Sequence, residues 1–216
     1  MDFAKSFSYI FEDPDWVKKV ALVAVVSLIP LVGWLVLVGF MLDVTRRVIN
    51  RDPRPLPELN FGEQLGLGLK YLGASLGYAV PILILQLPII IGSSVLTDGS
   101  DASTNIILAL SVCCGGLVFI YSILLGLVLP AAIGNMAAQN KVGAAYKFSE
   151  VIALVRANPG AYLMALVGTL LASFVAGLGT IACFIGVFFT MALAMAVQGH
   201  LIGQAYLAAT HNQAYR

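Results

Sequence analysis

Four long stretches of this chain contain no Asp, Glu, Lys or Arg: residues 20–42, 71–97, 102–140 and 157–215. About 20 consecutive apolar residues suffice to cross the hydrocarbon core of a bilayer as a helix. A helix also satisfies its own backbone hydrogen bonds, which lipid cannot do. The pattern therefore predicts an all-α protein, a polytopic transmembrane helix bundle that forms a single integral membrane domain over residues 1–216.

The composition agrees with a membrane protein and excludes several other classes. Hydrophobic residues make up 60% of the chain and charged residues 11%, whereas soluble domains average about 45–50% and about 25%. So many apolar side chains cannot all be hidden from water in a body of this size. The net charge of +1 gives no reason to expect nucleic acid as a partner, and we expect membrane lipids instead.

The lengths of the charge-free stretches predict five or six membrane segments. The second stretch holds one crossing, the third holds one that Pro130 should end, and the fourth holds two, divided at residues 176–179. The first stretch is interrupted by Pro30, and the arm before it, residues 17–29, makes only about 20 Å of helix. We expect a shallow or re-entrant hairpin there, and a single proline-kinked crossing is the alternative.

The positions of the cations predict the topology. All twelve Lys and Arg residues lie at the N-terminus, in residues 46–70, in residues 141–156 or at the C-terminus. Because positive loops stay in the cytoplasm, we expect both termini inside the cell and residues 97–104 and 176–180 outside. The protein should then be a multi-pass protein of the cell membrane. The hairpin interpretation keeps every cation on the cytoplasmic side.

A weak internal repeat accompanies this topology. Each of three units, residues 1–50, 58–138 and 142–210, starts with a short amphipathic stretch and continues with two apolar arms. Chance similarity among polytopic proteins is the alternative. In the first unit, Phe3, Phe7, Ile10 and Phe11 recur at helical spacing, which predicts a short amphipathic helix on the membrane surface. The expected interfacial anchors are Phe7, Phe11, Trp16 and Trp34.

Few polar residues lie in or beside the apolar stretches. His200 is a structural, interhelical hydrogen-bonding residue or a proton-carrying group, and Gln204 lies one helical turn after it. Gln86 lies between Pro81 and Pro88, as in a broken transporter helix or in a kinked helix steadied by one amide. Asp43 stands three and four residues before Arg46 and Arg47, which predicts a local ion pair.

The remaining sequence features indicate packing. We expect Cys113, Cys114 and Cys183 to be small apolar packing residues. Small residues four apart let helices approach closely, and they occur at Gly62/Gly66, Gly73/Gly77, Gly199/Gly203, Ala172/Ala176 and Ala192/Ala196. No hydrolase triad, nucleotide-binding loop or zinc motif is present. We therefore expect no catalytic residue, no metal and no cofactor.

Several motifs resemble a known family. They are Phe7-Ser8-Tyr9 with Pro14-Asp15-Trp16, Ile29-Pro30-Leu31-Val32-Gly33-Trp34, Pro55-Leu56-Pro57-Glu58 with Phe61-Gly62, and the closing Gly199-His200-Leu201-Ile202-Gly203-Gln204. Together they are similar to domain-of-unknown-function family 4013. The resemblance implies a small polytopic membrane protein of prokaryotes and implies no reaction.

Three functions follow as hypotheses. The first is a non-enzymatic integral membrane protein, a structural or accessory subunit of a membrane complex, whose partner is another membrane protein or a second copy. The second is a small transporter or channel. A lipid-acting membrane enzyme is the weakest, because no paired carboxylates accompany a histidine on the expected cytoplasmic side.

Overall fold

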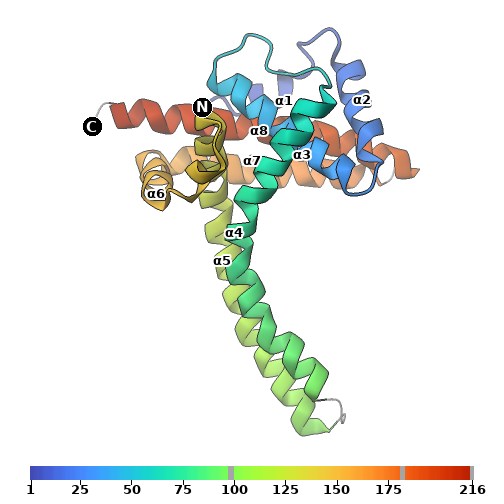
Figure 1. The fold of residues 1–216 in the computed structure, drawn as a ribbon, viewed down its shortest axis with the longest axis vertical. Coiled ribbons are helices and arrows are strands. Elements are labelled where there is room, and N and C mark those ends of the chain that lie inside the picture. Colours follow the sequence, from blue (N-terminus) through green and yellow to red (C-terminus); the bar gives the residue numbers. More distant parts are fainter. Residues whose placement is uncertain (97–99, 181–182, 215–216) are drawn as a thin grey trace. The chain divides into compact units, whose positions relative to one another are not determined.

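The computed structural model describes residues 1–96, 100–180 and 183–214, and all regular structure in them is helical. Figure 1 shows the order of the elements. They are α1 (Lys5–Ser8), α2 (Trp16–Ser27), α3 (Val32–Ile49), α4 (Phe61–Val95), α5 (Asp101–Gln139), the 3-10 helix η1 (Val142–Tyr146), α6 (Phe148–Ala157), α7 (Pro159–Leu178) and α8 (Cys183–Ala214). The prediction of an all-α protein is confirmed.

Four helices of the described chain are long and apolar enough to cross a membrane. These segments are Phe61–Val95, Asp101–Gln139, Pro159–Leu178 and Gly186–Gln213. They correspond to the second, third and fourth charge-free stretches, and the fourth stretch divides after Leu178 as predicted. The expectation that Pro130 ends its helix is wrong, because α5 continues through it to Gln139. A membrane helix tolerates proline where neighbouring groups satisfy the freed carbonyl.

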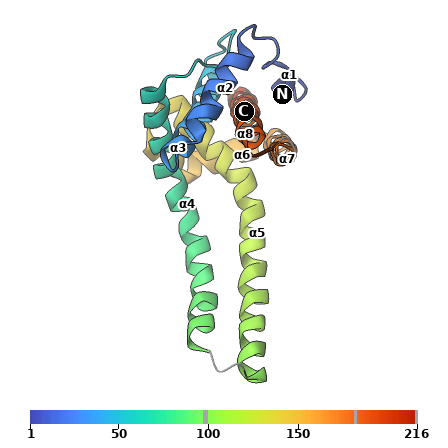
Figure 2. The same ribbon diagram turned by 90° about the vertical axis from the view of Figure 1, so that its right-hand side faces the viewer.

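The chain forms two compact units. Unit 2, Ser75–Gly126, contains the second part of α4 and the first part of α5, which lie side by side (Figure 2). The Tyr121 hydroxyl donates to the Tyr78 carbonyl at 3.0 Å, and a Cβ on Gly92 would lie 3.1 Å from Leu110 Cδ1. Most of the large aliphatic side chains of this pair are exposed. A large exposed apolar surface of this kind marks a contact with lipid or with another protein.

Unit 1, Met1–Ala74 with Leu127–Arg216, is built around α8. Helix α8 contacts α1, α2, α3, α6 and α7. Its contact with α3 is close, because a Cβ on Gly199 would lie 2.3 Å from the Met41 carbonyl oxygen and one on Gly203 would lie 2.7 Å from Val48 Cβ. The packing role of this glycine pair is confirmed. The same packing role is wrong for Gly62 and Gly66, since a Cβ added at either residue would meet nothing within 4 Å.

The first charge-free stretch consists of two helices that pack on each other, α2 and α3. The chain breaks between them at Pro30, where Leu31 adopts a φ of 63°. A Cβ on Gly33 would lie 2.5 Å from the Val26 carbonyl oxygen, so glycine is needed for this close turn. The predicted break is confirmed. Its tip is apolar and open, with Leu31 84% exposed and Leu28 and Ile29 about half exposed.

The predicted amphipathic helix at the N-terminus is largely wrong. Helix α1 covers only Lys5–Ser8, and the chain then turns, with Phe11 N–H bonding to the Ser8 carbonyl. Ile10 is 1% exposed and lies in the core, whereas Phe11 points to the surroundings. The helices that open the proposed repeat units also differ, because α6 has ten residues and Phe61 begins α4 itself. The repeat therefore stays a prediction.

Candidate functional site

A polar cavity of about 360 Å³ lies where the N-terminal segment, the loop after α3 and α8 meet. We call it the N-terminal pocket. Its lining residues are Lys5, Tyr9, Glu12, Asp13, Val48, Arg51, Asp52, Pro53, Arg54, Pro55, Leu56 and His200. Segments far apart in the sequence thus form one site inside unit 1.

His200 forms one wall of the N-terminal pocket and is only 5% exposed. Its ring stacks on the ring of Tyr9 with centroids 4.3 Å apart, and its Nδ1 lies 3.0 Å from Ser6 Oγ. The Tyr9 hydroxyl donates to the Ala196 carbonyl at 2.9 Å, and burial raises the Tyr9 pKa well above its ordinary value. The N-terminal segment is therefore fastened to α8 through the histidine and the tyrosine.

Gln204 connects the N-terminus to His200. The backbone N–H of Asp2 donates to Gln204 Oε1 at 2.8 Å, so the amide group of Gln204 must turn its Nε2 toward His200 Nδ1, 3.3 Å away. The Ser6 hydroxyl, which donates to the Asp2 carbonyl at 3.4 Å, contacts the same nitrogen. Nε2 of His200 has no hydrogen-bond partner among the described residues.

Asp13 ties the N-terminal segment to α2. Its carboxylate accepts from Lys19 Nζ at 2.6 Å and from the Asp15 backbone N–H at 2.9 Å. Burial alone would raise the Asp13 pKa, but these hydrogen bonds and the charges of Lys19 and Arg54 lower it below its ordinary value. Lys19 also donates to the Leu56 carbonyl at 3.2 Å, so the same cation holds the loop after α3.

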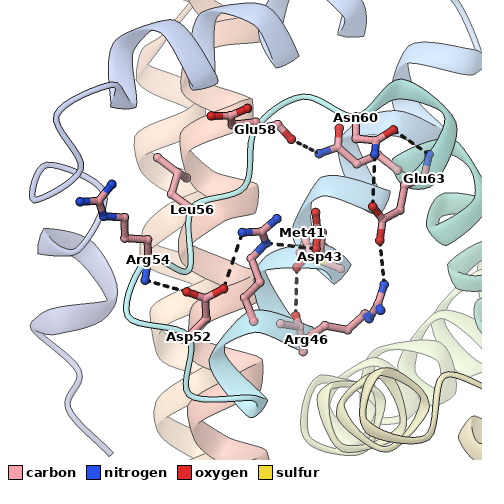
Figure 3. A network of polar contacts seen from close by, with 12 residues as sticks. Met41, Asp43, Arg46, Asp52, Arg54, Leu56, Glu58, Asn60 and Glu63 are labelled. Carbon is pink, nitrogen blue, oxygen red and sulfur yellow. Dashed lines mark hydrogen bonds and ion pairs between the residues drawn. The ribbon is translucent and has the colours of Figure 1, made fainter.

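Asp43 belongs to a neighbouring polar network, drawn in Figure 3. It is 5% exposed and accepts from Arg47 Nε at 3.4 Å. Burial raises the Asp43 pKa, an effect that the Arg47 charge only partly opposes. The predicted pair with Arg47 is present, whereas Arg46 pairs with Glu63 at 3.2 Å.

The same network holds the start of α4. Asn60 Oδ1 accepts from the Glu63 backbone N–H at 3.3 Å, which caps the helix. Gln64 Nε2 donates to the Glu58 carbonyl at 3.0 Å, while its Oε1 is buried with no hydrogen-bond partner among the described residues. Figure 3 shows the Arg54 side chain extending away from Asp52, whose carboxylate accepts from the Arg54 backbone N–H. Arg54 also lines a second cavity of about 700 Å³ beside this network.

A further polar cluster joins α5 to α6. Glu150 accepts from Lys147 at 2.9 Å and from the side-chain amides of Asn135 and Gln139, both at 3.1 Å. These hydrogen bonds lower the Glu150 pKa to about 2. Asn135 also donates to the Ala144 carbonyl at 3.0 Å. The cluster fixes the connection between the two helices.

Gln86 lies in unit 2, in the part of α4 between Pro81 and Pro88. Its side chain is half-buried, and its amide has no hydrogen-bond partner among the described residues. Pro88 has no N–H to offer the Ile84 carbonyl. The glutamine is thus a polar group in an otherwise apolar and exposed pair of helices.

The four expected interfacial anchors differ in exposure. Phe11 and Trp34 are exposed, while Phe7 and Trp16 are half-buried. The rings of Phe11 and Trp16 pack edge to face with their centroids 4.9 Å apart, and the ring centroids of Trp34 and Tyr71 are 6.4 Å apart. The ring centroids of Phe7 and Phe3 are 5.4 Å apart. These ring pairs show that the aromatic residues also pack within the protein.

Metal ligands are not gathered in the part of the chain that the structure describes, where no group of three His, Cys, Asp or Glu side chains could hold an ion. Cys114 is buried and Cys113 is exposed. The side chain of Cys183 lies outside the described residues.

Sequence reasoning singled out His200 and Gln204, which the structure brings together, and Asp43, which lies in the adjoining network. It did not identify Ser6 and Tyr9 as partners of His200. Their contacts span about 190 residues of sequence. The only available signal was a serine and a tyrosine within the aromatic N-terminal pattern.

A family model described as a protein of unknown function (DUF4013) matches residues 22–185. The chain belongs to the DUF4013 family. The resemblance noted in the sequence is confirmed, although its motifs at residues 7–16 and 199–204 lie outside the matched range. Neither the curated proteins nor the solved structures contain a match to the chain. Membership in the family assigns no activity, so function must be argued from the residues themselves.

Proposed function

We propose that this DUF4013 protein is a non-enzymatic integral membrane protein that acts as a structural or accessory subunit of a membrane complex. The observation that carries the proposal is Gln86. Its amide has no partner in the described chain, and it lies in a helix pair whose surface is otherwise apolar and exposed. A helix of another membrane protein would supply the missing hydrogen bond.

An amide moved from water into an apolar medium without a hydrogen bond is destabilised by about 2–7 kcal/mol, depending on the reference state. A lipid-facing glutamine at mid-membrane would carry much of that cost. A partner helix that offers a polar side chain removes it, and such groups commonly join membrane helices.

The hydroxyl groups of unit 2 support a structural role over a transport role. Ser93, Ser94, Ser111 and Ser122 each donate to a carbonyl three or four residues earlier in the same helix. Bonds of this kind satisfy the hydroxyls locally. They do not line up a row of polar groups along which a solute would pass.

We also propose a disposition in the membrane. Helices α4, α5, α7 and α8 cross it, and α2 and α3 enter as a shallow hairpin whose exposed Leu28, Ile29 and Leu31 meet the acyl chains. With this hairpin, all cations lie on the cytoplasmic side of the cell membrane, together with both termini. Single cysteines at Ser8 and Pro55 should both resist an impermeant thiol reagent in intact cells, and one at Ser100 should react. Labelling at Ser8 with protection at Pro55 would instead show a single crossing.

The proposal is tested by purifying the tagged chain from native membranes in mild detergent and quantifying stoichiometric partners. Gln86→Leu should reduce the copurified partner by about three- to thirtyfold, because polar contacts between membrane helices contribute about 0.6–2 kcal/mol. Gln86→Asn, which keeps an amide, should retain more of it. The matched control is Ile84→Leu, two residues away and therefore on nearly the opposite side of the helix.

Either of two results would contradict the accessory role. One is a wild-type chain that purifies alone at every detergent concentration while remaining inserted. The other is equal loss of the partner in the Gln86 and Ile84 variants. Transport by the purified chain in liposomes, abolished by Gln86→Leu, would favour the alternative of a small transporter, which rests on the same glutamine between Pro81 and Pro88.

A further inference from the structure

Three cations and three carboxylates line the N-terminal pocket. Asp13 is neutralised by Lys19, and Asp52 lies 3.7 Å from Arg47, two cations that are not part of the pocket lining. Glu12 has Lys5 at 4.0 Å. Asp52 shares Arg47 with Asp43, and the charge of Arg54 also acts on Asp13.

Two lining cations are left over. The guanidinium groups of Arg51 and Arg54 form no ion pair or hydrogen bond with any described residue, and both side chains are exposed at the pocket. Prolines on both sides of Arg54 stiffen the loop that presents it. The pocket therefore presents two guanidinium groups whose hydrogen-bond donors are not used by the described residues.

Arg51 occupies a backbone position that favours glycine. Its φ is 57°, and it follows the last turn of α3, where Asp52 N–H bonds to the Arg47 carbonyl and Arg51 N–H bonds to the Val48 carbonyl. These two bonds form a Schellman motif, whose left-handed residue is usually glycine. An arginine there adds backbone strain. The strained position carries a side chain that no internal contact uses.

His200 also lines the pocket, and its Nε2 has no hydrogen-bond partner among the described residues. The cavity volume of about 360 Å³ falls in the range of small-molecule sites, roughly 300–1,000 Å³. It therefore has room for a phosphate group together with part of the molecule that carries it.

We propose that the N-terminal pocket binds a phosphate ester, held by Arg51 and Arg54. The planar guanidinium group pairs with phosphate oxygens through two parallel N–H bonds, which suits it to this ligand. The ester comes either from a soluble metabolite or from the headgroup of an anionic phospholipid. The chemistry of recognition is the same for both.

The test uses the full chain in nanodiscs of phosphatidylcholine. One arm titrates glycerol 3-phosphate and inorganic phosphate by calorimetry. The other arm measures binding of the detergent-solubilised protein to phosphatidylcholine vesicles with and without phosphatidic acid. Binding in the first arm identifies a soluble ester, and binding in the second arm alone identifies a lipid headgroup. Absence of binding in both arms overturns the proposal.

Three variants distinguish binding at the N-terminal pocket from nonspecific attraction of anions to the protein's positive charges. Arg51→Gln and Arg54→Gln should each weaken binding about tenfold or more, since hydrogen bonds to charged groups are the strong ones. Arg156→Gln removes one exposed arginine of α6 away from the pocket and should change binding less than twofold. Equal weakening by all three variants would show nonspecific attraction and overturn the proposal.

Arg51→Gly tests whether a loss of binding is caused by misfolding. Glycine relieves the positive φ, so this variant should unfold at the same or a higher temperature than the wild type and still lose affinity about tenfold. If Arg51→Gly binds phosphate as well as the wild type does, Arg51 is not part of the site and the proposal fails.

Discussion

Gly199→Ala tests whether the close contact between α3 and α8 holds unit 1 together. The added Cβ would lie 2.3 Å from the Met41 carbonyl oxygen and 2.9 Å from Val44 Cβ. Both atoms belong to a helix packed along α8, and a backbone carbonyl cannot rotate away. The two helices must therefore separate. Separation also stretches the hydrogen bond from Thr45 Oγ1 to the Gly199 carbonyl, now 3.1 Å.

Three terms give the expected magnitude. Alanine in place of glycine favours a helix by up to about 1 kcal/mol. Overpacking a fitted contact destabilises by about 1–3 kcal/mol, and weakening a hydrogen bond between membrane helices adds about 0.6 kcal/mol. Since the contact here is with backbone, we expect a net loss of about 1–2 kcal/mol in the free energy of unfolding.

Gly66→Ala is the matched control. Gly66 lies in α4, and a Cβ there would meet nothing within 4 Å, so only the helix propensity remains and the variant should be as stable as the wild type or up to about 1 kcal/mol more stable. Both variants are compared by denaturant unfolding in the same detergent. If Gly199→Ala is as stable as Gly66→Ala, the helices do not depend on this contact and the reasoning is refuted.

Three further predictions concern polar groups, each measured as the unfolding temperature in detergent. His200→Gln should lower it modestly, because the stack on Tyr9 contributes about 0.5–1.5 kcal/mol; an unchanged value would show that the stack adds nothing. Asp43→Asn should leave the unfolding temperature unchanged or raise it at neutral pH, because the raised pKa of this carboxyl means that its charged form opposes folding. The difference between variant and wild type should shrink as the pH falls through that pKa. Asp13→Asn should lower it at neutral pH by removing the pair with Lys19. Since the Asp13 pKa is lowered, this stabilisation is present above the ordinary carboxyl pKa and disappears as the pH falls through the lowered value; a pH-independent difference would contradict the assignment.

The candidate site was only partly predictable. His200, Gln204 and Asp43 could be chosen from the sequence because polar residues are rare in apolar stretches. Their partners Ser6 and Asp2 could not, since the contact depends on how the N-terminal segment turns after Ser8. The unpaired Arg51 and Arg54 were equally hidden, because the sequence placed all cations of residues 46–70 in one cytoplasmic group.

The sequence by itself determined which segments form long apolar helices, where the chain breaks at Pro30 and after Leu178, and to which family it belongs. These properties depend on the composition of single segments, because transfer to an apolar medium is roughly additive over consecutive residues. The tertiary structure decided which faces are buried. A Cβ added at Gly199 would meet a carbonyl oxygen, whereas one added at Gly66 would meet nothing within 4 Å. Ile10 is buried, whereas its neighbour Phe11 is exposed. The rotation and crossing of packed helices set these outcomes, and helical periodicity alone does not specify them.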